Sequence, residues 1–178
     1  AEFGVDMLGM AKGGTPAGAS GAPQPPRVRK YFPETLYFNP LLITDANGIA
    51  STEIKLADSI TTWRLTSLAS SKDGMLGSKT FPMRVFQDFF IDIDFPISLI
   101  QNDEVSVPVA VYNYLPTEQK ILLKAEKADW FVLLDEPEKE VILRPDEVRA
   151  VYFTLKVKNI GNYSFTVYGY SEKKSDAI

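Results

Sequence analysis

Residues 105–111 read Val105-Ser-Val-Pro-Val-Ala-Val111, with a valine at every second position. Successive side chains of a β-strand point to opposite faces, so this spacing places the four valines on one face. Apolar residues alternate in the same way in residues 89–95 and 151–157. The pattern predicts half-buried antiparallel strands, and therefore an all-β fold for this part of the chain.

Further strands are predicted between these three, and turn residues separate them at the spacing typical of a β-sandwich. About seven strands fall within roughly 85 residues, which is enough for a complete antiparallel sandwich similar to fibronectin type III. The other predicted strands are 119–126, 130–134, 140–143 and 163–167, with turns at 144–147 and 159–162.

The region that precedes this sandwich also has the residue pattern of β-strands, but it contains too few strands to form a sandwich of its own. Four strands cannot easily close a sandwich without help, so we expect part of this first module to be missing. Its unpaired strands would leave it open to self-association or to pairing with a neighbouring chain. The predicted strands are 36–43, 49–56, 60–69 and 80–86, and Asp45-Ala-Asn-Gly48 is a strong turn signal.

The composition changes sharply near residue 27. Six of the 11 glycines lie at or before Gly21, and residues 13–26 are small, rich in glycine and proline, and nearly uncharged. Such a segment buries too little apolar surface to offset the entropy of ordering it, so residues 1–27 are expected to be extended or disordered. Ala1-Glu-Phe3 resembles a cloning remnant and is left out of the fold argument.

The residue types that are absent exclude several classes of chemistry. The 178 residues include no cysteine and no histidine, which excludes disulfides, thiolate nucleophiles, histidine-based triads and imidazole metal ligands. The net charge is −4 with both signs interspersed, so no basic patch for nucleic acid is expected. No apolar run approaches the roughly 20 residues that span a bilayer. We expect no catalytic residue, no metal site and no cofactor.

Two groups of residues have an alternative functional interpretation. Asp88, Asp92 and Asp94 suggest a calcium cluster, but calcium usually takes more oxygen ligands, often from one loop. A solvated strand face is the preferred interpretation. Trp130 and Phe131 are adjacent large rings that would point to opposite faces of a strand, so a wide core and a seam between domains are expected there.

Three segments resemble one known family in their order and spacing. They are Val28-Arg-Lys-Tyr-Phe-Pro-Glu-Thr35, Asp58-Ser-Ile-Thr-Thr-Trp63 and Phe86-Gln-Asp-Phe-Phe-Ile-Asp92. Together they resemble the alpha-2-macroglobulin and complement protein family just after its protease-sensitive insertion. The lack of disulfides favours a bacterial member over an animal one.

The resemblance implies a domain organisation that explains the shortage of strands. Residues 28–86 would be the second half of the sixth macroglobulin domain, whose other strands lie before the insertion. Residues 87–172 would be a complete seventh domain, and residues 173–178 a tail. Residues 1–27 would be the end of the bait region, the segment that proteases cut, although an engineered linker would have a similar composition.

The resemblance also implies roles for individual residues. Basic and apolar residues near the N-terminus would be bait cleavage positions, and large aromatic residues near the domain boundary would pack between domains. The cleavage candidates are Met7, Leu8, Met10, Lys12, Arg27, Arg29 and Lys30, and the packing candidates are Trp63, Phe86, Phe89 and Phe90.

The expected function is structural rather than enzymatic. The chain would be a scaffold fragment of a broad-spectrum protease inhibitor, located in the periplasm, on the cell surface or outside the cell. Its partners would be proteases, met through the parent protein, and other macroglobulin domains. The alternative is a complement-like opsonin or surface-adhesion module, whose sandwiches bind partners without trapping proteases.

Overall fold

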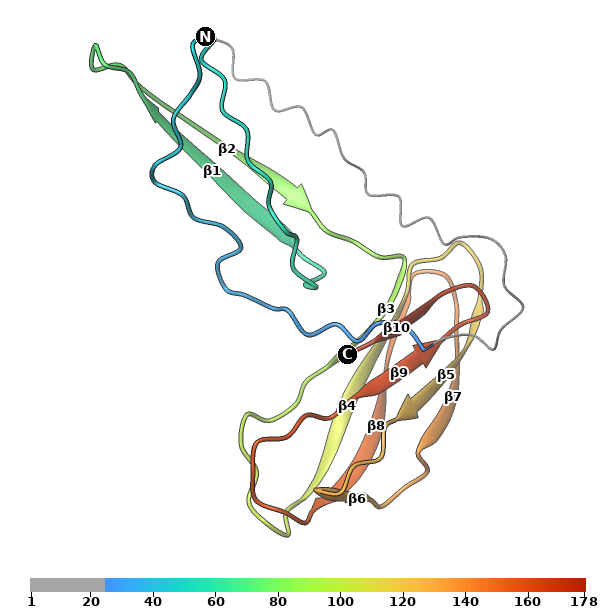
Figure 1. Ribbon diagram of the computed structural model, residues 1–178. Helices are drawn as coiled ribbons and strands as arrows, with labels where there is room; N and C mark the ends of the chain where they lie inside the picture. Colours follow the sequence, from blue (N-terminus) through green and yellow to red (C-terminus); the bar gives the residue numbers. More distant parts are fainter. Residues whose placement is uncertain (1–24) are drawn as a thin grey trace. The chain divides into compact units, whose positions relative to one another are not determined.

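The computed structural model describes residues 25–178, which contain ten β-strands and no helix (Figure 1). The described chain divides into two compact units. One consists of Pro33–Ala57, and the other combines Pro25–Phe32 with Asp58–Ile178. No helix in the described part is long and apolar enough to cross a membrane.

The larger unit contains a sandwich of two four-stranded sheets, with strand orders β3-β4-β8-β6 and β10-β9-β5-β7. Every neighbouring pair of strands in these sheets is antiparallel, which confirms the predicted all-β sandwich. The strands are β3 (Phe89–Ile93), β4 (Glu104–Asn113), β5 (Gln119–Ala125), β6 (Phe131–Leu133), β7 (Glu138–Leu143), β8 (Glu147–Val157), β9 (Val167–Tyr170) and β10 (Ser175–Ala177).

The core of the sandwich is made by the alternating positions that the sequence marked. Val107, Val109 and Val111 of β4 are completely buried, and Val107 lies opposite the equally buried Phe153 of β8. The facing sheet contributes fully buried residues from β5, β7 and β9: Ile121, Leu123, Leu143 and Val167. Burying these side chains between two sheets supplies most of the driving force for folding of this unit.

The C-terminal part of the sandwich differs from the prediction. Residues 173–178, expected to be a tail, contain β10, which pairs with β9 and adds an eighth strand. The strand expected at 163–167 begins only at Val167, and the preceding residues 158–166 are irregular. The Phe165 side chain is buried, and Tyr163 stacks on Trp130 with ring centroids 5.5 Å apart.

The adjacent rings of Trp130 and Phe131 are both buried, so the seam expected between domains is not needed to cover either of them. Trp130 lies just before β6 and therefore does not follow the strict alternation of a strand. Its indole N–H donates to the Ser164 carbonyl at 3.1 Å, and its ring meets Phe131 at 4.6 Å.

A separate two-stranded hairpin is formed by β1 (Thr62–Ser70) and β2 (Leu76–Arg84). Its strands begin and end close to the expected positions, except that β2 starts earlier than residue 80 because Ser70 pairs with Leu76. One face of the hairpin is apolar and the other is mainly polar. The apolar face carries the cross-strand pairs Trp63–Met83 and Leu65–Phe81.

The smaller unit does not form its two predicted strands. Residues 36–43 and 49–56 are irregular, because an apolar pattern makes a strand only where a neighbouring strand is available to pair with its backbone. The predicted turn between them is confirmed. The Asp45 N–H donates to the Ile49 carbonyl at 2.8 Å, and Gly48 adopts a φ of +79°, which glycine accepts at little cost.

Candidate functional site

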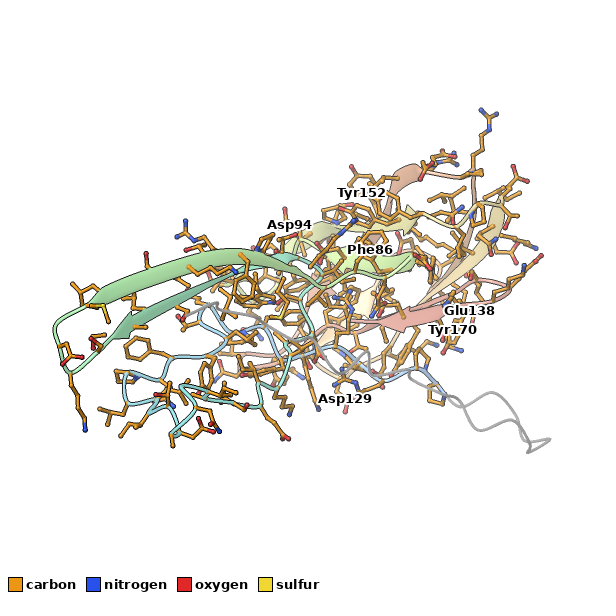
Figure 2. All side chains as sticks on the ribbon, turned by 90° about the horizontal axis from the view of Figure 1, so that it is seen from above. Phe86, Asp94, Asp129, Glu138, Tyr152 and Tyr170 are labelled. Atoms are coloured by element: carbon orange, nitrogen blue, oxygen red, sulfur yellow. The ribbon has the colours of Figure 1, made fainter. Side chains whose placement is uncertain are left out.

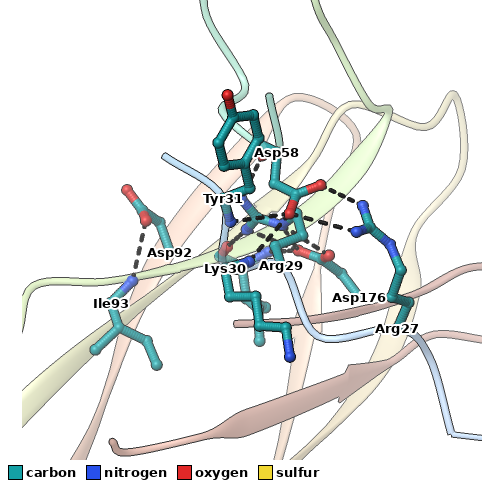
Figure 3. A network of polar contacts seen from close by, with 9 residues as sticks. Arg27, Arg29, Lys30, Tyr31, Asp58, Asp92, Ile93 and Asp176 are labelled. Carbon is teal, nitrogen blue, oxygen red and sulfur yellow. Dashed lines mark hydrogen bonds and ion pairs between the residues drawn. The ribbon is translucent and has the colours of Figure 1, made fainter. Parts of the chain in front are cut away.

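The main polar cluster of the described chain surrounds Arg29, at the start of the larger unit (Figure 3). Only 7% of Arg29 and 4% of its partner Asp176 are exposed. The Arg29 Nε lies 2.9 Å from Asp176 Oδ1, and its Nη2 donates to Asp176 Oδ2 at 3.0 Å. The geometry is bidentate, which gives a strong and directional ion pair.

The same ion pair connects the two sheets of the sandwich. Asp176 belongs to β10 and accepts a hydrogen bond from the Ile91 N–H of β3 at 3.0 Å. The Arg29 Nη2 donates to the Ile91 carbonyl oxygen. The cluster therefore satisfies the backbone of one sheet with a carboxylate from the other, and each buried charge has a partner.

A second carboxylate holds the other side of the same segment. Asp58 forms an ion pair with Arg27 and accepts hydrogen bonds from the Lys30 N–H at 3.1 Å and the Tyr31 N–H at 3.0 Å. The Asp58 N–H in turn donates to the Tyr31 carbonyl at 2.8 Å. We refer to residues 27–31 as the docked segment, because two carboxylates distant in sequence fix its backbone and side chains.

The environment of Asp58 lowers the pKa of its carboxyl group. Burial raises this pKa, but the hydrogen bonds from the backbone and the interaction with the Arg27 guanidinium together outweigh burial. The pKa of Asp58 is therefore below its ordinary value of 3.8. The charged form is preferred in the folded chain more strongly than in the unfolded chain.

The replacement Asp58→Asn tests this preference as a function of pH. A carboxyl whose pKa is lowered by folding contributes stability above its unfolded pKa and loses it as the pH falls through the folded pKa. The free energy of unfolding should therefore be higher for wild type than for Asp58→Asn above about pH 5. We expect this difference to shrink steadily as the pH falls below 3.8. Urea denaturation at a series of pH values measures it.

A matched control for this experiment is Glu104→Gln. Glu104 forms an ion pair with Lys156 at 2.9 Å, but both side chains are about half exposed. Solvent screens such a pair, so its removal should change stability by at most about 1 kcal/mol at any pH. The free energies of unfolding of wild type and Asp58→Asn would contradict the role assigned to Asp58 if their difference stayed constant from about pH 6 to about pH 3.

The predicted cleavage positions fall into two groups. Met7, Leu8, Met10 and Lys12 lie outside the described residues. Arg27, Arg29 and Lys30 all belong to the docked segment, where Arg27 is 75% exposed on its side chain and Arg29 is buried. Their use as cleavage positions stays a prediction, and the burial of Arg29 argues against cleavage at that residue.

The aromatic residues predicted to pack between domains have different environments in the structure. Phe89 faces the core of its own sandwich and is 2% exposed, because it occupies an inward position of β3. Phe90 points the other way and stacks on Tyr112 at 4.2 Å. Phe86 is 41% exposed and contacts Tyr114 at 5.4 Å. Trp63 lies in the hairpin, half-buried. Phe86 and Trp63 thus remain the stronger candidates for packing between domains.

Both sheets carry cross-strand ion pairs on their outer faces, and Figure 2 labels Glu138 of β7 and Tyr152 of β8. The β5–β7 face carries cross-strand ion pairs, Lys120–Glu140 and Lys124–Glu138, each at 2.9 Å. The face of β4 and β8 carries the exposed Tyr152 together with the polar pairs Glu104–Lys156 and Ser106–Thr154. Ion pairs of this kind are typical of a solvated face, and they occur on both sheets.

Outside the polar cluster, the described residues give little indication of a metal site or a binding pocket. Among residues 25–178, no group of three or more acidic side chains comes together to hold a metal ion. Asp92 and Asp94 are exposed, and the Asp92 carboxylate accepts a hydrogen bond from the adjacent Ile93 N–H. A surface depression of about 480 Å³ lies beside β6, and the Oδ2 atom of Asp135, one of its lining residues, pairs with Lys139 Nζ at 2.6 Å.

The polar cluster was not foreseen from the sequence. Asp58 begins one of the segments that carried the family resemblance, which marked its position but not its role. Asp176 lies in residues expected to be a tail, and no pattern there pointed to a buried charge.

The fold and this cluster define a β-sandwich module that carries an extra docked segment, and comparison with known proteins identifies its family. The model of the alpha-2-macroglobulin family matches residues 35–125, just over half of the chain. The chain belongs to the alpha-2-macroglobulin family, which is a family of protease inhibitors.

Solved structures of bacterial alpha-2-macroglobulins have the same fold. A Salmonella alpha-2-macroglobulin reacted with methylamine aligns with a TM-score of 0.53 at 15% identity, and the native conformation of the E. coli protein aligns with a TM-score of 0.52 at 14% identity. A point mutant of the Salmonella protein gives a TM-score of 0.51 at 16% identity. In each case the match covers 70% of this chain and 8% of the other chain.

Proposed function

We propose that this chain is the part of a broad-spectrum, bait-type protease inhibitor in which the cleavable bait joins its scaffold. Residues 1–27 would be the end of the bait, and the sandwich would hold the chain while other parts of the protein capture the protease. Membership of the alpha-2-macroglobulin family supports the proposal. The observation that carries it is the docked segment, which ties the residues next to the proposed bait to a sandwich through buried charges.

The sandwich has the properties that a scaffold needs. Its core is continuous across both sheets, and its cross-strand ion pairs lie on a solvated face. The exposed aromatic residue Phe86, between β2 and β3, is available for packing against further domains. We propose that residues 28–86 are half of one macroglobulin domain and that the following sandwich is a complete one.

The hairpin supports the view that the first domain is completed by other strands. Its apolar face carries Trp63, Leu65, Phe81 and Met83, yet its own sheet has only two strands. Isolated two-stranded hairpins are marginally stable, so such a face needs further strands. We propose that strands of the parent protein outside this chain supply them, and that a second copy could substitute for them in isolation.

The proposed setting is outside the cytoplasm. A broad-spectrum inhibitor encounters its target proteases in the periplasm, at the cell surface or outside the cell. Covalent capture through a thioester would be performed elsewhere in the parent protein, because this chain contains no cysteine. The proposed partners are proteases and neighbouring macroglobulin domains.

Limited proteolysis of the full chain tests the bait proposal. Trypsin cuts after basic residues and thermolysin cuts beside large apolar residues, so both should cleave within residues 7–27 if this segment serves as bait. The sandwich strands β3–β10 should stay uncut under the same conditions, because cleavage there requires unfolding. Mass spectrometry of the new N-termini identifies each site.

Lys12→Ala is a matched control for this experiment. The replacement removes a trypsin site without affecting cleavage beside Met7, Leu8 or Met10, so only the tryptic rate should fall. If the segment before residue 27 resists both enzymes in the wild-type chain while the sandwich is cut, the bait proposal is wrong.

A further inference from the structure

The docked segment extends one sheet of the sandwich at its edge. Val28 forms a parallel bridge with Ala177 of β10, and the Arg29 N–H donates to the Ala177 carbonyl at 2.8 Å. β10 is the outer strand of its sheet, so this contact satisfies backbone groups that an exposed edge would leave free. The backbone of the segment is therefore already engaged with the sandwich.

The Arg29 side chain fastens the segment more firmly than backbone pairing alone. Its guanidinium enters the seam between β10 and β3, where it contacts Asp176 and the Ile91 carbonyl. With only 7% of Arg29 exposed, the side chain cannot enter the specificity pocket of a protease without leaving this seam. Leaving it would separate two buried charges, which is costly.

Proteases act on chain that can adopt an extended conformation in their cleft, with its backbone groups free. The docked segment lacks this freedom at several adjacent positions. The N–H groups of Arg29, Lys30 and Tyr31 are all bonded within the folded chain. Cleavage after Arg27, Arg29 or Lys30 therefore requires the segment to open first.

We infer that the Arg29–Asp176 ion pair sets the C-terminal limit of the cleavable bait. Proteases cut before Arg27, while residues 27–31 stay docked on the sandwich and keep the new N-terminal end of the chain attached to it. This inference rests on the proposed bait function, and it assigns Arg29 a positioning role in place of its predicted role as a cleavage site.

The experiment compares tryptic cleavage at individual bonds in the full 178-residue chain. Mass spectrometry follows the rates of cleavage after Lys12, Arg27, Arg29 and Lys30. In the wild-type chain we expect products that begin at Gly13 and none that begins within residues 28–31. Asp176→Asn retains every trypsin site and removes the counter-ion of Arg29. The rates of cleavage after Arg27, Arg29 and Lys30 should rise by about tenfold or more, because the docked segment would be released from the sandwich in a larger fraction of the chains.

Controls separate opening of the segment from general unfolding. Glu104→Gln removes an exposed ion-pair partner and should leave all four rates unchanged. In Asp176→Asn, sites inside the sandwich such as Lys120 and Arg149 should remain uncut. If that variant unfolds, Arg29→Lys serves instead, since it keeps the charge and the trypsin site but loses the bidentate geometry.

The outcomes distinguish failure of this inference from failure of the proposed bait function on which it rests. Rapid cleavage after Arg29 or Lys30 in the folded wild-type chain, at a rate similar to that after Lys12, would overturn the inference and leave the bait function standing. Resistance of residues 7–26 to every protease would overturn the bait function. An equal rate after Lys30 in wild type and in a folded Asp176→Asn chain would also overturn the inference.

Discussion

Asp176→Ala is expected to lower the free energy of unfolding of the sandwich by about 3–5 kcal/mol. The replacement leaves the Arg29 guanidinium buried without its counter-ion and removes the acceptor of the Ile91 N–H. Breaking one side of a buried pair costs much more than the pair itself contributes, because the remaining charge is desolvated and unpaired. Urea denaturation followed by far-UV circular dichroism measures the change.

The matched control for this prediction is Glu104→Ala. Its ion pair with Lys156 has the same 2.9 Å separation as that between Arg29 and Asp176, but its side chains are 55% and 42% exposed. Its loss should cost at most about 1 kcal/mol. Equal effects of the two replacements would show that burial of the Arg29–Asp176 pair has no energetic consequence, contrary to the structure.

Phe153→Ala is expected to have an effect of similar size for a different reason. Phe153 lies in the middle of β8, opposite Val107, and none of its surface is exposed. Replacing it with alanine removes apolar contacts and leaves a cavity between the sheets, which costs about 3–5 kcal/mol. Chemical denaturation and the protection of β4 amides against hydrogen exchange both report the loss.

The neighbouring residue supplies an internal control. Tyr152 points to the opposite face of the same strand and is 54% exposed, so Tyr152→Ala should change stability by only about 0.5 kcal/mol. A one-residue shift in the register of β8 would exchange the two faces. A larger effect at Tyr152 than at Phe153 would therefore contradict the observed register.

Much of the sandwich could be predicted because its pattern is local. Alternation in Val105–Val111 and Val151–Val157 marks an inward face whatever the partner strand is. Residues 36–43 show where such reasoning fails. They are apolar enough for a strand, but a strand also requires a neighbouring backbone to pair with, and sequence pattern does not provide that information.

The candidate site was less predictable than the fold. The resemblance places a boundary near residue 28, which stays a prediction, whereas the family itself is shown by the match over residues 35–125. Arg29, however, was interpreted as one of several basic cleavage residues, since nothing in its local sequence distinguishes it from Arg27 or Lys30. Its partner Asp176 is 147 residues away, so their pairing depends on how β10 closes the sandwich.

The sequence by itself determined the all-β class, the inward faces of the main strands and the family. These depend on side-chain periodicity and on segments read in order along the chain. Only the tertiary structure decided which charges are buried, that residues 175–177 form an edge strand, and that residues 27–31 dock beside it. The physical reason is that burial and ion pairing are set by contacts between segments distant in sequence, whereas periodicity is a property of each segment alone.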